Sequence, residues 1–160
     1  MPRAARTAFA LLLAAGPAAA QTGEPRYVTP GWFGLGVGVS TVGLFVELDA
    51  AQIWEPNAIR ARITLHDSQE LDVAREPVTV EEYALLYGYA RRYRRNWGAA
   101  WLGLSLVEGS RNDVPFRTVG IPLEAQVVSR DIPFGVTVLA NLNRARPFAA
   151  VGVMFPLGRR

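Results

Sequence analysis

Residues 57–66, NAIRARITLH, decide the fold class because apolar and polar residues alternate along them without a break. The aliphatic side chains take the odd positions and the polar ones the even positions: Ile59, Ala61, Ile63 and Leu65 against Arg60, Arg62, Thr64 and His66. A helix would spread this pattern around its circumference, whereas a strand places the aliphatic residues on one face and both arginines on the other. The segment therefore predicts a strand with two arginines on its polar face.

The same alternation predicts eight strands in all, at 31–40, 43–53, 57–66, 80–92, 97–108, 118–129, 134–143 and 147–156. Their lengths cluster at about ten residues, which is the length that a tilted strand needs to cross a bilayer. Most strands of soluble proteins are shorter. Residues 78–95 are ambiguous because Glu81, Glu82 and Leu85 suit a helix. The shared parity of the tyrosines in this segment, and a glycine at Gly88, favour a strand.

The first 30 residues do not join this pattern. Residues 1–20 combine a basic start, an apolar run of about ten residues and a small-residue end, which predicts a signal peptide cleaved before Gln21. Residues 21–30 are expected to form a leader, and residues 31–157 one barrel domain. The formal charge of +3 includes Arg3 and Arg6 of the signal peptide, so the mature chain is close to neutral and nucleic acid is not an expected partner.

The orientation of the two strand faces separates a membrane barrel from a soluble one. The polar face consists mostly of small residues with a few charges of both signs, which suits the narrow lumen of an eight-stranded barrel. We therefore predict an all-β, eight-stranded antiparallel up-and-down barrel of the membrane type. The lumen is expected to hold Arg60 and Arg62 against Glu47 and Asp49, with Glu124 reaching the same cluster, because buried guanidinium groups need carboxylate partners.

Aromatic residues near the predicted strand ends support the membrane assignment. Such residues form girdles at the lipid–water boundary of membrane barrels. They are Tyr27, Trp32, Trp54, Tyr93, Trp97, Phe116, Phe134, Phe148 and Phe155. Trp101 lies in the middle of a predicted strand and does not fit this pattern.

Taken together, the exported start, the glycine-rich first strand GWFGLGVGVS and the closing strand RPFAAVGVMFPL resemble the small outer-membrane β-barrel proteins of the OmpX and OmpA-transmembrane-domain type. The resemblance covers about residues 31–157. It implies insertion by the barrel-assembly machinery through a C-terminal strand that ends in an aromatic residue, a part that Phe155 would play.

The connections between strands indicate possible contacts outside the barrel. With both chain ends on the periplasmic side, the two longest polar connections, 67–79 and 108–117, face the exterior, where an extracellular partner would bind. Four arginines lie in the connection at 90–96: Arg91, Arg92, Arg94 and Arg95. They are expected to contact the headgroups of outer-membrane lipids, or to anchor the barrel edge at the interface.

Candidate catalytic residues are few and lie at one strand end. His66, the single histidine, and Ser68 share one strand parity, and the arrangement resembles the His-x-Ser of the outer-membrane lipid A deacylase, with Glu70, Glu81 or Glu82 as a possible third member. That family's motif lies in a late strand and faces lipid, so a polar strand end is the favoured interpretation. There are no cysteines and no metal-ligand spacing, so no metal and no cofactor are expected. Because a polar strand end is the favoured interpretation of His66 and Ser68, no enzymatic activity is expected either.

The predicted function is therefore a structural or interaction role for a small barrel in the bacterial outer membrane, with its lumen filled by side chains. Two alternatives remain open. One is a soluble periplasmic, lipocalin-like barrel whose aliphatic face lines a cavity for an apolar ligand. The other is a hydrolase that modifies lipid A.

Overall fold

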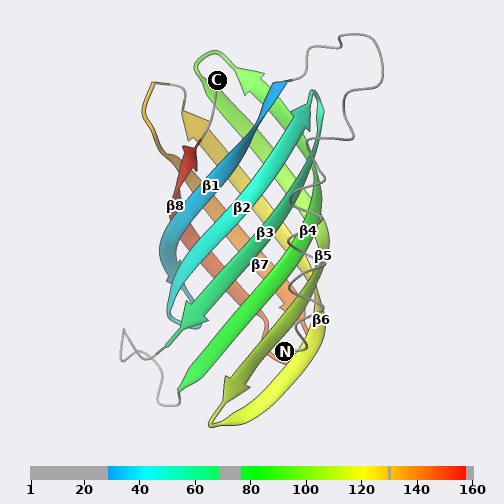
Figure 1. Cartoon of the computed structure of the whole chain (residues 1–160), viewed down its shortest axis with the longest axis vertical. Coiled ribbons are helices and arrows are strands. Elements are labelled where there is room, and N and C mark those ends of the chain that lie inside the picture. The colour runs from blue at the N-terminus through cyan, green and yellow to red at the C-terminus, as the bar shows by residue number, and fades with distance from the viewer. Residues whose placement is uncertain (1–28, 69–76, 130, 158–160) are drawn as a thin grey trace.

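The computed structural model describes residues 29–68, 77–129 and 131–157, and these form eight strands connected in an up-and-down order (Figure 1). The strands are β1 (Thr29–Ser40), β2 (Leu44–Trp54), β3 (Asn57–Asp67), β4 (Val78–Tyr93), β5 (Asn96–Arg111), β6 (Val114–Ser129), β7 (Gly135–Asn143) and β8 (Phe148–Leu157). Every sequential pair is antiparallel. No helix long and apolar enough to span a membrane occurs within these ranges.

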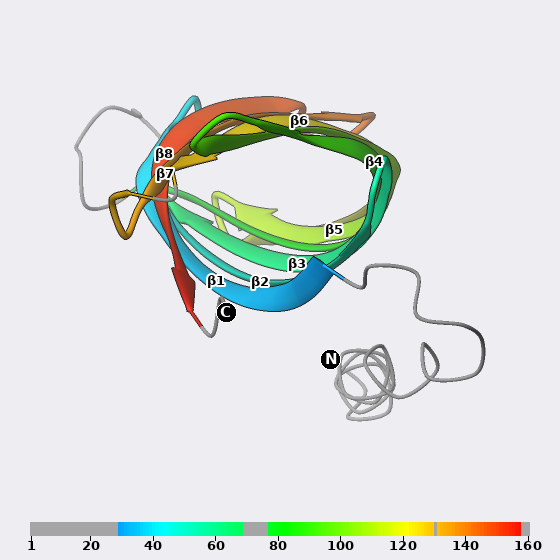
Figure 2. The same ribbon diagram turned by 90° about the horizontal axis from the view of Figure 1, so that it is seen from above.

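Pairing of the first strand with the last closes the sheet. β1 lies antiparallel to β8, with Val37 opposite Val153 and Gly38 opposite Gly152, so the eight strands form a continuous cylinder (Figure 2). Closure leaves no strand edge with unpaired main-chain groups, which is the requirement for a sheet surrounded by lipid. The even number of strands brings the start of β1 and the end of β8 to one end of the cylinder, here called the terminal end.

The predicted fold class is confirmed, and segment 78–95 is a strand over most of its length. One connection was predicted wrongly. Residues 108–117 are not a loop, because β5 continues to Arg111 and β6 begins at Val114. The chain reverses at Asn112 and Asp113, which have φ of 50° and 63°, the left-handed pair that a tight two-residue hairpin requires. The polar side chains of this segment indicated a loop, but they belong to a hairpin that extends the barrel wall.

The outer face of the cylinder is aliphatic around its circumference. Outward-facing residues of this kind include Leu35, Val37, Val46, Leu48, Leu65, Leu85, Leu102, Leu104, Leu123, Val127, Val136, Val138 and Val151, all of them exposed. A water-soluble protein rarely exposes an apolar surface larger than a few hundred Å². The alternative of a lipocalin-like carrier, in which these side chains line an internal cavity, is therefore wrong.

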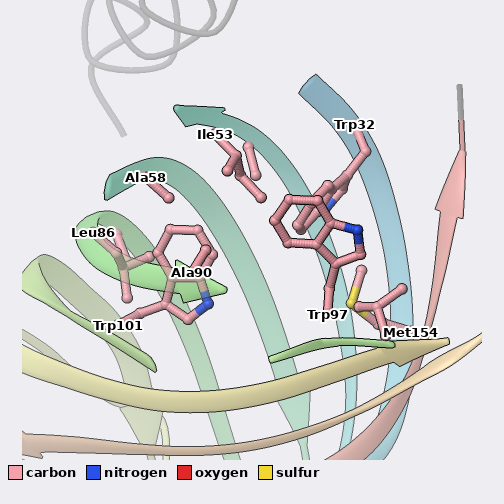
Figure 3. Packing of buried hydrophobic residues seen from close by; sticks show 11 residues of the cluster. Trp32, Ile53, Ala58, Leu86, Ala90, Trp97, Trp101 and Met154 are labelled. Atoms are coloured by element: carbon pink, nitrogen blue, oxygen red, sulfur yellow. The ribbon is translucent and has the colours of Figure 1, made fainter. Parts of the chain in front are cut away.

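The lumen is filled in three layers. At the terminal end, Trp32, Ile53, Leu86, Trp97 and Met154 belong to an apolar cluster, the terminal plug, whose side chains meet from different strands (Figure 3). At the other end, Phe45, Val80, Val107, Leu139 and Phe148 belong to a second cluster, the outer plug.

Between the plugs lies a layer of charged and polar side chains, here called the charged layer: Glu47, Asp49, Arg60, Arg62, Thr64, Glu82, Ser105, Glu124, Thr137 and Asn141. Every one of them is buried. The lumen is therefore packed like the core of a soluble protein, inside a wall whose outer face is apolar. The two plugs separate the charges from the solvent at both ends.

The aromatic girdle is only partly as predicted. Trp54, Tyr93, Phe134 and Phe155 are exposed, whereas Trp32, Trp97 and Phe148 are buried in the plugs, and Phe116 packs against the outer plug. The correction has a simple physical reason: an aromatic residue near a strand end faces lipid or lumen according to its parity, and position along the strand does not determine parity. Tyr27 lies outside the described residues.

Candidate functional site

Strand register places the two arginines of β3 in the middle of the lumen. Arg62 lies opposite Asp49 of β2 and Arg60 opposite Ala51, while on the other side Thr64 lies opposite Glu82 of β4. Residues that face one another across antiparallel strands share a face of the sheet, so the guanidinium groups and the carboxylates all point inward. Both arginine side chains are fully buried.

Each arginine bridges carboxylates from different strands. Arg60 is ion-paired with Glu47, with Asp49 at 2.8 Å and with Glu124 on the far wall. Arg62 donates through Nη1 to Glu124 Oε2 and through Nη2 to Glu82 Oε2, both at 2.5 Å. Glu124 therefore accepts from both guanidinium groups and ties β6 to β3 across the lumen. The structure thus brings together Glu47, Asp49, Arg60, Arg62 and Glu124.

Glu82 is the charged residue of this layer that the sequence did not predict to lie there. Besides Arg62, it accepts hydrogen bonds from Thr64 Oγ1 at 3.2 Å and from the Asn141 amide, which also donates to Ser105 Oγ at 2.7 Å. The signal was available, because Glu82 has the parity opposite to Tyr83 and so shares the lumen face. Its proximity to Glu81 in the helix-like stretch hid that alternation.

Glycines on β1 make room for these large side chains. A Cβ at Gly34 would collide with the Asp49 carboxylate, and one at Gly38 would collide with the Phe45 ring. On the side of the terminal plug, the Arg60 guanidinium lies over the Trp101 ring at 5.7 Å from its centroid. Trp101, which did not fit the girdle, therefore forms the boundary between the terminal plug and the charged layer.

The charged layer contains two more carboxylates than guanidinium groups. Two of its oxygens, Glu47 Oε2 and Asp49 Oδ1, have no hydrogen-bond partner among the described residues. No group of three or more histidine, cysteine or acidic side chains within residues 29–68, 77–129 and 131–157 is arranged to hold a metal ion. The chemistry supported by this arrangement is cross-linking of the barrel walls through ion pairs.

His66 and Ser68 are both buried, and each has its own hydrogen bonds. His66 Nδ1 lies 3.0 Å from Ser40 Oγ and Nε2 lies 3.2 Å from Thr64 Oγ1, while its ring stacks against Phe45. Ser68 Oγ accepts a hydrogen bond from the Val78 amide at 2.8 Å. No hydrogen bond between these two described residues joins them into a nucleophile–base pair.

The four arginines near the β4–β5 turn are all exposed at the terminal end: Arg91 and Arg92 lie in the last residues of β4, and Arg94 and Arg95 form the turn itself. We call them the arginine turn. Arg92 lies over the Trp97 ring at 5.0 Å, Arg94 over Tyr93 at 5.8 Å, and Arg95 is 3.4 Å from Asp131. On the outer face of β4 just before the turn, Tyr87, Tyr89 and Tyr93 are exposed. Tyrosines followed by arginines are typical of a lipid–water boundary.

A closed eight-stranded barrel with an apolar outer face and a lumen filled by side chains defines the class of small membrane β-barrels, and the chain has that fold. Among solved structures it is similar to the Neisserial surface protein A, NspA, with a TM-score of 0.56 and 9% identity over 79% of this chain and 92% of that one. It is also similar to the outer membrane enzyme PagL, with a TM-score of 0.51 and 11% identity over 78% of this chain and 97% of that one. No protein-family model and no curated protein sequence matches the chain.

The likeness to PagL corrects one expectation. The absence of a catalytic motif led us to expect no enzymatic activity, but PagL shows that this architecture does carry an enzyme. At 11% identity the likeness is one of fold, and it transfers no catalytic residue to this chain.

Proposed function

We propose that this protein is a small barrel of the bacterial outer membrane with a structural or interaction role in the cell envelope. The observation that carries the proposal is the pairing of a continuous aliphatic outer face with a lumen filled along its length by two plugs and a charged layer. Such a lumen offers no path for solutes, so contacts with other molecules take place on the outer wall and at the two ends.

The two ends have different proposed contacts. The arginine turn lies at the terminal end, which faces the periplasm if the chain is inserted as outer-membrane barrels are, and its guanidinium groups suit phosphate headgroups of the inner leaflet. At the opposite end, the 67–79 connection and the 108–117 hairpin face the cell exterior and are the proposed contact surfaces for an extracellular partner. Residues 69–76 of that connection lie outside the described part of the chain.

The proposal includes the route by which the protein reaches the membrane. Residues 1–20 are proposed to direct export, although they too lie outside the described residues, and β8 is proposed to be recognised by the barrel-assembly machinery through Phe155. Phe155 is exposed on the outer face near the end of β8, where a recognition factor can reach it.

Membrane fractionation of cells that express the full chain tests the location. We expect the protein in the outer-membrane fraction, with migration in detergent gels that changes on heating because the closed barrel resists unfolding by detergent. Release into plain buffer after cell lysis would overturn the proposal. Addition of the purified protein to a planar lipid bilayer tests the filled lumen, and steady ion-conducting channels would contradict it.

A further inference from the structure

A cavity at the mouth of the barrel, here called the mouth pocket, lies at the end opposite the termini. The β5–β6 hairpin contributes Arg111, Val114, Pro115 and Phe116 to its wall, and the β7–β8 connection contributes Ala145 and Arg146. Its volume is about 390 Å³, within the range of small-molecule sites. Phe116 also packs against the outer plug, so the pocket has a firm apolar floor.

The lining of the mouth pocket combines two arginines and Asn112 with apolar residues. No carboxylate belongs to the wall that the structure describes. Neighbouring Arg117 is already paired, with its Nε 3.0 Å from Glu108 Oε1. Of Arg146, by contrast, only main-chain groups take part in the hydrogen bonds found among the described residues. A half-buried guanidinium beside an apolar floor lacks the anion that would compensate its lost hydration.

The main chain that carries Arg146 is held in place from within the barrel. Asn143 Oδ1 accepts from the Arg146 amide at 2.7 Å, and Asn143 Nδ2 donates to the Arg146 carbonyl at 2.8 Å. Asn143 Nδ2 also lies 3.0 Å from Asn141 Oδ1, and Asn141 belongs to the charged layer. The opposite wall is fixed by the tight turn at Asn112 and Asp113. Both walls are therefore preorganised, which lowers the entropic cost of binding a ligand.

We propose that the mouth pocket binds a small organic anion, a phosphate or carboxylate attached to an apolar ring or short chain. Arg146 holds the anionic group, because the guanidinium fork matches two oxygens at once. Val114, Pro115 and Phe116 hold the apolar part. The inference deepens the proposed function, on which it rests for the side of the membrane that the pocket faces.

Calorimetric titration of the barrel folded in a neutral maltoside detergent tests this proposal, with phenyl phosphate as the probe. We expect saturable binding of phenyl phosphate, binding of inorganic phosphate at least fivefold weaker, and no saturable binding of the uncharged phenyl glucoside. Equal affinity for phenyl and inorganic phosphate would overturn the role of the apolar wall. Saturation by phenyl glucoside, or by none of the three, would overturn the site itself.

Variants assign the binding to named residues. R146Q is expected to weaken phenyl phosphate binding at least tenfold, whereas R144Q, an exposed arginine of the same connection outside the pocket wall, is expected to leave it unchanged. V114S, at a highly exposed position, is expected to lower the preference for phenyl over inorganic phosphate several-fold without unfolding the barrel. Equal losses in R146Q and R144Q would indicate general charge attraction and contradict a built site.

Competition experiments in bilayer discs distinguish a lipid headgroup from a soluble molecule as the source of the anion. If phosphatidylglycerol in the disc displaces phenyl phosphate, the natural anion is a lipid headgroup; if it does not, the anion is a soluble molecule, and either result supports the pocket. Heat-modifiable migration of each variant shows independently of binding whether the barrel is folded. A folded, membrane-bound barrel that fails to bind overturns the pocket alone, and a binding protein that fractionates with soluble proteins overturns the proposed function alone.

Discussion

The charged layer and the arginine turn use the same residue type under opposite conditions. Arg60 and Arg62 are fully buried, and between them they contact four carboxylates contributed by β2, β4 and β6. The arginine turn is exposed, and its ion pair within the described chain is the 3.4 Å contact between Arg95 and Asp131, two side chains that remain largely in water. Because the charged layer is buried, each of its charges must be paired within the protein. Water can take the place of the partners of the exposed arginine turn.

The buried and the exposed arginines also have different tasks. Inside the lumen, arginine cross-links walls that are far apart in sequence, such as β3 and β6. At the terminal end, Arg92 and Arg94 place their guanidinium groups over the aromatic rings of Trp97 and Tyr93, and both side chains remain exposed. Loss of a buried arginine should therefore weaken the whole barrel, and loss of an exposed one should change only the boundary with the lipid.

The largest effect is expected from R60A. It removes the cation that pairs with Glu47 and Asp49 and leaves Glu124 with Arg62 alone, and breaking a buried ion pair from one side costs about 3–5 kcal/mol. Urea unfolding in detergent, followed by heat-modifiable migration, measures the loss. A cost below about 1 kcal/mol would mean that water reaches the charged layer and that the lumen is not sealed.

A slightly smaller effect is expected on the outer face. Leu104, outward-facing and highly exposed, lies near the middle of β5, and L104R should destabilise the barrel in lipid by about 2–4 kcal/mol, the cost of a cation near the bilayer midplane. Y93R, close to the arginine turn, is the matched control and should cost less than about 1 kcal/mol. Equal costs at both positions would contradict a hydrocarbon environment around Leu104.

An intermediate effect is expected when the excess carboxylates are removed. The double variant E47A/D49A removes two hydrogen-bonded partners from Arg60 but leaves as many carboxylates as guanidinium groups, so we expect a loss of about 1–3 kcal/mol. The unfolding midpoint in detergent should fall by less than in R60A. If the midpoint does not fall at all, Glu47 and Asp49 of β2 contribute no net stability to the barrel.

The smallest effect is expected from R95A. An exposed ion pair contributes less than about 1 kcal/mol, and that contribution is screened by salt, so the unfolding midpoint should hardly move. Binding to vesicles that contain anionic lipid measures the proposed headgroup contact directly, and it should weaken for a variant lacking all four arginines of the turn. A loss of stability in R95A as large as that of R60A would remove the distinction between the two groups.

Much of the charged layer follows from strand parity. Alternation identified Arg60, Arg62, Glu47, Asp49 and Glu124 as residues of one face, and closure of the cylinder makes that face an interior. Glu82 escaped notice because its segment also suits a helix, and only its register opposite Thr64 of β3 places it beside Arg62. The mouth pocket was not predictable, because the hairpin and the β7–β8 connection that form it are about 30 residues apart in sequence.

By itself, the sequence determined the all-β class of fold, since a period of two indicates strands, and segments of about ten residues favour strands that cross a membrane. Tertiary structure alone decided which side chains pack together in each plug, that residues 108–117 continue the barrel wall, and which carboxylate each guanidinium contacts. The physical reason is that alternation specifies a side for every residue but not its neighbours across the lumen. Those neighbours depend on the stagger of eight strands around a closed cylinder, which becomes defined only when β1 pairs with β8.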